Sequence, residues 1–349
     1  MKRRETRKVK IGDIYIGGDS KITVQSMTNT DTRDVKATVE QILKLEESGC
    51  DIVRCAVPDM QAAEAIKDIV KEIHIPLVAD IHFDYKLALK AIENGVSKLR
   101  INPGNIGSID RVEMVAKAAK ERNIPIRIGV NSGSLEKEVL NKYGKVCSEA
   151  LAESALNHVR ILEKVNFEDI IISIKSSDVV QMIDAYNIVS NKVNYPLHIG
   201  VTEAGTIWRG TIKSSVGIGA LLAQGIGDTL RVSLTGDVIE EVKVGREILK
   251  SLGMLDDGIK FVSCPTCGRT QINLIKIAEE AEKRLSHVNK NIKVAIMGCA
   301  VNGPGEAKEA DVGIAGGNGE GLIFRKGQII RKVREEDLLD ELIKEIESL

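Results

Sequence analysis

The chain has 349 residues, of which 43% are hydrophobic, and its formal net charge is −1. This length exceeds one ordinary compact domain unless part of the chain is a barrel of about 250 residues. A charge near zero argues against recruitment to nucleic acid or an anionic membrane by a global field, and an aromatic content of 3% argues against base-stacking surfaces.

The cysteines and the N-terminal segment indicate the cell compartment. Six cysteines in this length do not form a disulfide framework, and Cys50, Cys55 and Cys147 are expected to be buried small hydrophobes. No apolar run reaches the roughly 18 residues of a membrane span, and the basic start lacks the apolar stretch of a secretory signal. We therefore expect a cytoplasmic protein in a reducing compartment.

The first 250 residues, approximately, repeat one pattern: a short apolar strand, a turn and a helix. A small hairpin precedes the first strand. Strands are predicted to begin at Ile22, Asp51, Pro76, Ser97, Pro125, Asp169, Pro196 and Asp228. Helices are predicted over Val35–Ser48, Met60–Glu72, Lys86–Asn94, Ile109–Arg122, Cys147–Lys164, Val179–Asn191, Ser214–Gln224 and Val238–Leu252. Eight such units favour a closed (β/α)8 TIM-type barrel over residues 1–258.

Residues 259–349 are predicted to form a small α/β domain. The expected elements are a strand Phe261–Cys264, a helix Gln271–His287, strands Ile292–Met297 and Asp311–Ala315, a hairpin Gly321–Val333 and a closing helix Glu335–Glu347. Two cysteine clusters lie at strand ends within this domain, where the backbone is rigid enough to hold a preorganised site.

The alternation of side chains along the barrel strands predicts a polar interior. The apolar parity should face the helices. The other parity should point inward and carries Thr23, Gln25, Arg54, Asp80, His82, Arg100, Asn102, Arg127, Asn131, Ser173, Lys175, His198, Arg231 and Ser233. Five strands thus carry an inward Arg or Lys, whereas Asp80 is the one clear acid of this parity. Burying several cations together is costly unless an anion balances their charge, so we expect a phosphate or diphosphate ligand.

Three cysteines and a glutamate in the second domain predict a metal centre. Cys264 and Cys267 form a C-P-T-C pair, and 31 residues separate Cys267 from Cys299. Because no cysteine follows Cys299, Glu306 is the candidate fourth ligand, brought back by an Asn-Gly-Pro-Gly turn. Three thiolates and one non-thiol ligand suit an iron–sulfur cluster, and they also suit zinc, which spacing alone does not exclude.

Several motifs carry a resemblance to a known family. They are Cys-Pro-Thr-Cys-Gly-Arg-Thr (264–270), Gly-Cys-Ala-Val-Asn-Gly-Pro-Gly-Glu-Ala (298–307), Gln-Ser-Met-Thr-Asn-Thr (25–30), Leu-Arg-Ile-Asn-Pro-Gly-Asn (99–105), Ile-Gly-Val-Asn-Ser-Gly-Ser (128–134) and His-Ile-Gly-Val-Thr-Glu-Ala-Gly (198–205). Together they resemble the two-domain bacterial 4-hydroxy-3-methylbut-2-enyl diphosphate synthases over nearly the whole chain.

This resemblance implies an iron–sulfur oxidoreductase of the non-mevalonate isoprenoid pathway. It implies a [4Fe-4S] cluster held by Cys264, Cys267, Cys299 and Glu306, with 2-C-methyl-D-erythritol 2,4-cyclodiphosphate as substrate. Flavodoxin or ferredoxin would donate electrons, and the chain would form a homodimer in which the cluster domain of one subunit caps the barrel of the other.

The inward side chains fit such a substrate. Those expected to bind it are Arg54, His82, Arg100, Asn102, Arg127, Asn131, Lys175 and Ser233. Glu203 follows the seventh strand, where barrels keep acid–base groups, and is the expected proton donor.

Two other functions stay open at this point. One is a zinc-dependent barrel transferase that uses an anionic, pterin-like cofactor. The other is a non-catalytic iron–sulfur carrier that binds a phosphorylated ligand.

Overall fold

The computed structural model describes residues 2–286, 288–300, 305 and 307–349, and the chain divides into two compact units, Met1–Met254 and Leu255–Leu349. In the described residues, no helix has the length and apolarity needed to cross a membrane.

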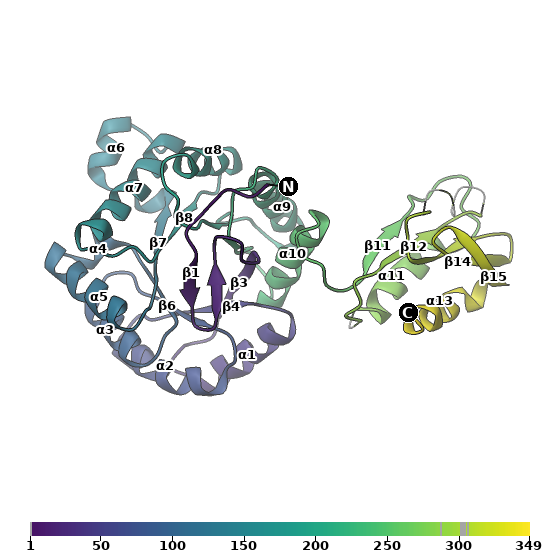
Figure 1. Ribbon diagram of the computed structural model, residues 1–349, viewed down its shortest axis with the longest axis horizontal. Helices are drawn as coiled ribbons and strands as arrows, with labels where there is room; N and C mark the ends of the chain where they lie inside the picture. The colour runs from purple at the N-terminus through teal and green to yellow at the C-terminus, as the bar shows by residue number, and fades with distance from the viewer. Residues whose placement is uncertain (1, 287, 301–304, 306) are drawn as a thin grey trace. The chain divides into compact units, whose positions relative to one another are not determined.

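The first unit is a (β/α)8 barrel, as the sequence predicts (Figure 1). Its strands are β3 (Thr23–Met27), β4 (Ile52–Ala56), β5 (Leu77–Asp80), β6 (Lys98–Ile101), β7 (Ile126–Asn131), β8 (Ile170–Lys175), β9 (His198–Ile199) and β10 (Thr229–Leu230). Each strand pairs in parallel with its neighbour, β10 pairs with β3, and a bridge from Ile172 to Leu197 joins β8 to the β9 segment. The sheet is therefore nearly closed.

Helices surround this sheet. The main ones are α1 (Val35–Glu47), α2 (Met60–Glu72), α3 (Tyr85–Glu93), α5 (Ile109–Glu121), α7 (Ser148–Lys164), α8 (Val179–Ser190), α9 (Ile207–Ala223) and α10 (Val238–Ser251). Aspartates cap several of them: the side chains of Asp34, Asp59 and Asp178 each accept a hydrogen bond from a backbone N–H in the first turn of their helix. These caps satisfy donors that have no partner inside the helix.

The structure differs from the predicted barrel elements at three places. Helix α9 begins at Ile207, seven residues before the predicted start, and its first turn includes Gly210, where a Cβ would lie 2.6 Å from Leu234 Cδ2. Two short helices, α4 (Pro103–Ile106) and α6 (Lys137–Tyr143), lie in loops where none was predicted, and a 3-10 turn η1 spans Ser132–Ser134.

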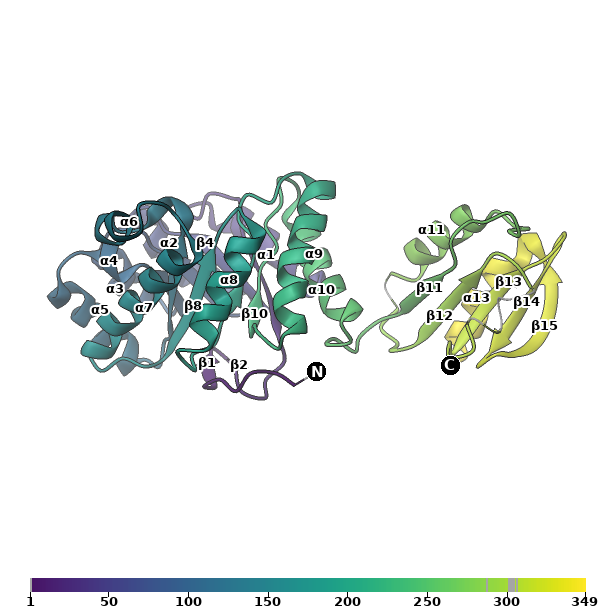
Figure 2. The ribbon, with the colours of Figure 1, turned by 90° about the horizontal axis from the view of Figure 1, so that it is seen from above.

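An N-terminal hairpin closes one end of the barrel. It consists of β1 (Val9–Ile11) and β2 (Ile14–Ile16), which pair antiparallel. The apolar side chains of this hairpin pack on three inward residues of the barrel strands; the cluster is Val9, Ile11, Ile16, Ile52, Val78 and Ile171. This apolar floor, at the end where the hairpin lies in Figure 2, separates the barrel interior from solvent at the amino ends of the strands.

The second unit is built on a five-stranded sheet in the order β11-β12-β13-β14-β15. Its elements are β11 (Lys260–Ser263), α11 (Leu274–Arg284), β12 (Lys293–Met297), β13 (Val312–Gly316), β14 (Glu320–Arg325), β15 (Gln328–Arg334), a 3-10 turn η2 (Glu335–Asp337) and α13 (Leu338–Glu347). Helix α11 is shorter than predicted because Asn273 caps it, and the predicted end at His287 lies outside the described residues. Helices α11 and α13 bury their apolar sides against this sheet.

Candidate functional site

The barrel interior holds six basic side chains, which we call the cationic interior. They are Arg54 on β4, Lys98 and Arg100 on β6, Arg127 on β7, Lys175 on β8 and Arg231 just after β10. Exposure is 9% or less for the first five residues and 15% for the Arg231 side chain. Because the hairpin floor covers the amino ends of the strands, these charges face the carboxyl ends, where TIM barrels place their active sites.

Asp80 is one of two carboxylates among these cations. Arg100 Nη1 donates a hydrogen bond to Asp80 Oδ1 at 3.0 Å, and Arg54 Nε lies 3.6 Å from Asp80 Oδ2. His82 Nε2 lies 3.7 Å from the same oxygen, although its own side chain is 58% exposed. Burial would raise the pKa of the Asp80 carboxyl, but Arg54, His82 and Arg100 together hold it well below its usual range. Asp80 is therefore ionised and fixes two arginines.

Glu241 is the second carboxylate, and it comes from helix α10 rather than from a strand. It is 4% exposed, and its Oε2 lies 3.4 Å from Arg231 Nη2. Its other oxygen accepts a hydrogen bond from the Leu234 backbone N–H at 2.9 Å. Glu241 thus holds Arg231 and the loop after β10 in one place.

The deepest layer is organised by Gln25, which is 1% exposed. Its Oε1 accepts hydrogen bonds from Lys98 Nζ and Arg127 Nη1, each at 3.3 Å. Burial and then neighbouring guanidinium charges hold the pKa of Lys98 and the pKa of Arg127 well below their ordinary values. A bound anion would stabilise the charged forms of these side chains, because it would balance positive charges that the protein leaves uncompensated.

The pKa values of two further interior side chains, His198 and Lys175, are also lowered by burial and by neighbouring positive charges. Burial and the charge of Arg127 depress the pKa of His198 well below its usual value, so its ring is neutral at pH 7. His198 Nδ1 lies 3.3 Å from Thr229 Oγ1. Burial and then the charge of Arg231 likewise depress the pKa of Lys175.

Two glycines make room for these long side chains. A Cβ on Gly129 would lie 2.5 Å from Arg100 Nε. A Cβ on Gly200 would lie 2.3 Å from the Arg231 carbonyl oxygen and 3.4 Å from Lys175 Nζ. Both distances to the arginines are shorter than a carbon atom tolerates, so any larger residue would displace the guanidinium or the strand.

The remaining predicted site residues lie around the carboxyl ends of the strands. Asn102 is buried, and its side chain accepts a hydrogen bond from the Gly104 N–H at 3.2 Å, while Asn131 and Ser233 are half-buried. Glu203 is exposed on the loop after β9, with a φ of 51°. A positive φ is strained for a glutamate, and such strain is concentrated at functional loops.

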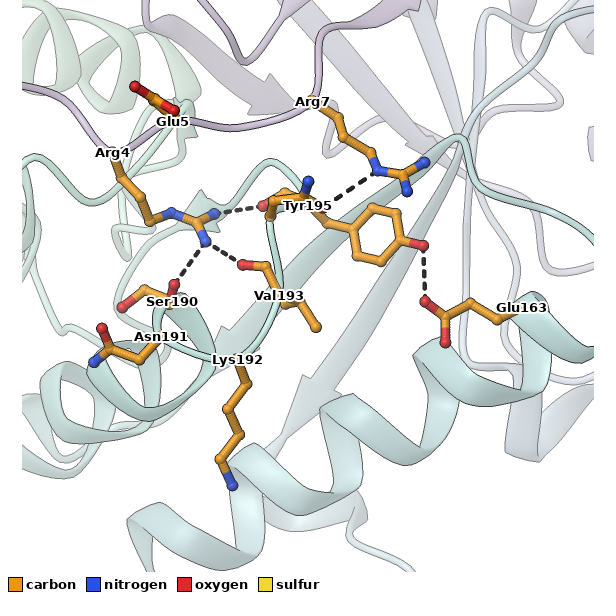
Figure 3. Close-up of a pocket in the computed structure, with 10 residues that line it drawn as sticks. Arg4, Glu5, Arg7, Glu163, Ser190, Asn191, Lys192, Val193 and Tyr195 are labelled. Carbon is orange, nitrogen blue, oxygen red and sulfur yellow. Dashed lines mark hydrogen bonds between the residues drawn. The ribbon is translucent and has the colours of Figure 1, made fainter.

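A cavity of about 490 Å3 lies elsewhere on the barrel and has a structural explanation (Figure 3). Arg4 donates to the backbone carbonyls of Ser190 at 2.9 Å and of Tyr195 at 2.5 Å, and also to that of Val193. The Tyr195 hydroxyl donates to Glu163 Oε1 at 2.9 Å. This arginine thus satisfies carbonyls at and beyond the C-terminal end of helix α8 and holds the N-terminal segment against the barrel.

The cysteines of the second unit follow two neighbouring parallel strands. Cys264 comes directly after β11, and Cys299 comes two residues after β12. The Gly298 N–H donates to Cys264 Sγ at 3.1 Å, and the Arg269 backbone N–H, then its side chain, lowers the pKa of Cys267. The lowered pKa of Cys267 favours the thiolate that a soft metal needs.

The complete ligand set is not assembled in the described part of the chain. In that part, no three His, Cys, Asp or Glu side chains are grouped so that they could hold a metal ion. Glu306, the predicted fourth ligand, lies outside the described residues.

Sequence reasoning missed Lys98, which belongs to the cationic interior, and two residues that contact it, Met27 and Glu241. Lys98 has the inward parity of Arg100, two residues on, so counting the strand from its first residue would have found it. Met27 shares the parity of Gln25 but reads as an ordinary hydrophobe. Glu241 gave no signal, since it lies on a helix whose inner face is otherwise apolar.

Fold and site together define a TIM-barrel protein with a cationic interior and a separate cysteine-bearing α/β unit. Family models match both parts: the GcpE TIM-barrel domain over residues 6–246 and the GcpE protein C-terminal domain over residues 260–348. The chain therefore belongs to the GcpE family, the family of the 4-hydroxy-3-methylbut-2-enyl diphosphate synthases.

Individual curated relatives are similar to this chain over its full length or nearly so. The chain is 73% identical to the 4-hydroxy-3-methylbut-2-en-1-yl diphosphate synthase (flavodoxin) of Clostridium acetobutylicum, covering all of both chains. It is 61% identical to the protein of the same name from Geobacter sulfurreducens, covering 99% of this chain and 98% of that one. These matches confirm the predicted family and enzyme class, an iron–sulfur oxidoreductase.

The solved structures show the fold alone. The dihydropteroate synthase of Stenotrophomonas maltophilia matches with a TM-score of 0.51 at 14% identity, covering 71% of this chain and 98% of that chain. That of Yersinia pestis matches with a TM-score of 0.50 at 10% identity, covering 70% and 98%. At such low sequence identity a structural match indicates the fold and not the function. The alternative of a pterin-using transferase is therefore not favoured over the activity of the GcpE family.

Proposed function

We propose that the chain converts 2-C-methyl-D-erythritol 2,4-cyclodiphosphate to (E)-4-hydroxy-3-methylbut-2-enyl diphosphate. With the diphosphate ionised, the reaction consumes two electrons and one proton: a ring C–O bond to the diphosphate breaks, one hydroxyl leaves as water, and a C=C double bond forms. The observation that carries the proposal is the surplus of six cations over two carboxylates inside the barrel. A diphosphate group carries the negative charge and the oxygen acceptors that would balance this surplus of positive charge.

The diphosphate would be held by Arg54, Arg100, Arg127 and Lys175. Guanidinium groups form paired hydrogen bonds with phosphate oxygens, and in a dry interior each charge counts for more than in water. Because Asp80 already fixes Arg54 and Arg100, their direction is set before the substrate arrives. Asn102, Asn131, His82 and Ser233 would orient the hydroxyl groups through neutral hydrogen bonds.

Glu203 would deliver the proton that the departing hydroxyl needs to leave as water. Its position after β9 supports this role, because the same end of the barrel receives the cationic side chains. Glu203 lies on an exposed loop and has a strained backbone conformation. Its carboxyl group could therefore reach a bound ligand from solvent and donate a proton to it.

The reducing group would be a [4Fe-4S] cluster, and the residues present fit one. Cys264, Cys267, Cys299 and Glu306 would hold it, and the Gly298 N–H contact to Cys264 Sγ and the lowered pKa of Cys267 support this donor set. When bound, the cluster supplies single electrons and a Lewis-acidic iron. The protein's own part is to bind the diphosphate, to exclude water from it and to place Glu203.

A flavodoxin is the proposed electron donor, because the relatives carry flavodoxin in their name; ferredoxin is the alternative. A cytoplasmic location follows from a donor of this kind. A homodimer in which the cluster unit of one subunit serves the barrel of the other would bring the two parts of the site together.

The decisive experiment uses protein purified and reconstituted without oxygen. Incubation with the cyclodiphosphate and a chemical reductant should yield the linear diphosphate, and metal analysis should find iron and sulfide. Zinc without iron or sulfide would end the proposal in favour of a zinc enzyme.

Two variants separate the proposed roles. Glu306→Cys should retain the cluster, seen in its absorption spectrum, but lose turnover; unchanged function would support a mere electron carrier. Glu203→Gln should also lose turnover while its affinity for the cyclodiphosphate stays near that of the wild type. A large loss of affinity instead would make Glu203 a binding residue.

A further inference from the structure

Strand β3 gathers four of the six cations onto two neutral side chains. Gln25 and Met27 are two residues apart and so point to the same inward face. Gln25 Oε1 receives Lys98 and Arg127, each at 3.3 Å. Met27 Sδ receives Arg54 Nη2 at 2.9 Å, Arg54 Nε at 3.1 Å and Arg231 Nη1 at 3.7 Å. Each acceptor thus joins cations that come from different strands.

Neutral acceptors have a specific electrostatic advantage in an anion site. Like charges held close together repel each other, and something must keep them in place. A carboxylate does so but cancels one positive charge, as Asp80 and Glu241 do beside this strand. An amide oxygen or a thioether sulfur accepts the same hydrogen bonds and leaves the charge available to a ligand.

Gln25 bears a cost that packing alone does not explain. It is 1% exposed, and within the described residues its Nε2 has no hydrogen-bond partner. A buried donor without a partner costs about 1–3 kcal/mol. The two cations determine the orientation of the amide, because turning it over would point its NH2 group at Lys98 and Arg127. A residue selected only to fill space here would be apolar.

We propose that Gln25 and Met27 are positioning residues that converge Lys98, Arg127, Arg54 and Arg231 on the diphosphate without neutralising them. The inference rests on the proposed diphosphate site and adds two residues to it. Neither side chain needs to touch the substrate, since each acts through the cations that it holds.

Position 27 allows a direct test, because it is only half-buried. The variants are Met27→Leu, which matches the shape but removes the acceptor, Met27→Gln, which restores a neutral acceptor, and Met27→Glu, which adds a charge. Binding of inorganic diphosphate to the anaerobically prepared holoenzyme is measured by calorimetry, and KM and kcat are measured with the cyclodiphosphate.

We expect Met27→Gln to bind inorganic diphosphate within about threefold of the wild type. Met27→Leu and Met27→Glu should each bind about tenfold more weakly, which corresponds to about 1.4 kcal/mol. KM should rise by a similar factor, whereas kcat should change less. Gln25→Glu should weaken binding in the same way, and Val24→Ala on the opposite face of β3 should bind like the wild type while lowering the melting temperature.

A packing role predicts the reverse order at position 27. Wild-type affinity in Met27→Leu together with a loss in Met27→Gln would overturn the inference, even if Gln25→Glu failed to fold. If the wild-type enzyme itself did not bind inorganic diphosphate, the proposed substrate site would fail, and the inference with it. Wild-type binding with unchanged affinity in all four variants at positions 25 and 27 would refute the inference alone.

Discussion

Replacing Asp80 by Asn tests whether the barrel interior is held together by a buried ion network. Asp80 is 5% exposed and lies 3.0 Å from Arg100 and 3.6 Å from Arg54. At an effective dielectric constant of about 20, each attraction amounts to roughly 5 kcal/mol before desolvation is subtracted. Removing one partner of a buried pair costs about 3–5 kcal/mol, because the remaining charges stay buried without compensation.

The assay is thermal unfolding of the barrel unit in the full-length protein. A loss of about 3 kcal/mol should lower its melting temperature by roughly 6–12 °C. Inorganic diphosphate should recover more stability in Asp80→Asn than in the wild type, because the variant interior carries one more uncompensated positive charge. The control is Asp68→Asn, which removes an exposed partner of Lys71 and should leave the melting temperature nearly unchanged.

The pH dependence follows from the depressed pKa of Asp80. A carboxyl with a lower pKa in the folded state stabilises the protein above its unfolded pKa of about 3.9 and loses this effect as pH falls. The stability difference between wild type and Asp80→Asn should therefore be constant from about pH 5 to 7 and shrink below about pH 4. Equal melting temperatures at pH 7 would refute the ion-network argument.

Three further variants test other features of the barrel. Gly129→Ala places a Cβ 2.5 Å from Arg100 Nε and should raise KM about tenfold in steady-state kinetics; an unchanged KM would mean that Arg100 has room to move. Arg127→Ala removes a charged donor and should weaken diphosphate binding by about 10- to 100-fold in calorimetry, whereas wild-type affinity would exclude it from the anion site. Ile11→Ala opens a cavity in the hairpin floor and should cost about 2–5 kcal/mol in denaturant unfolding; a cost well below this would show that the floor does not seal the barrel.

Local patterns were sufficient to predict much of this protein. Strand parity placed Arg54, Arg100 and Arg127 on one face because side chains alternate with a period of two, independently of what the strands pack against. The repeated strand–helix unit predicted the barrel for a similar reason, since parallel strands require crossover connections. The enzyme class was predicted from the cysteine spacing and from the motifs shared with the family.

Some elements needed more than a local pattern. Helix α9 already includes Gly210, a poor helix former that lies against Leu234 with no room for a Cβ, and no propensity scale contains such a tertiary contact. The short helix α4 begins at Pro103 directly after its cap Asn102, and it is too short to show a periodicity; a Cβ on Gly104 would lie 2.6 Å from His158 Cε1 on helix α7.

The sequence by itself therefore determined the architecture, the surplus of inward cations and the motifs that carry the family, because each depends on residues close together in the chain. Only the tertiary structure decided which cation shares which acceptor. Gln25 meets Lys98 and Arg127 across the barrel, and Glu241 reaches Arg231 from a helix, because closing the sheet brings distant strands within hydrogen-bond range. Such pairings depend on curvature and depth, which a one-dimensional pattern does not encode.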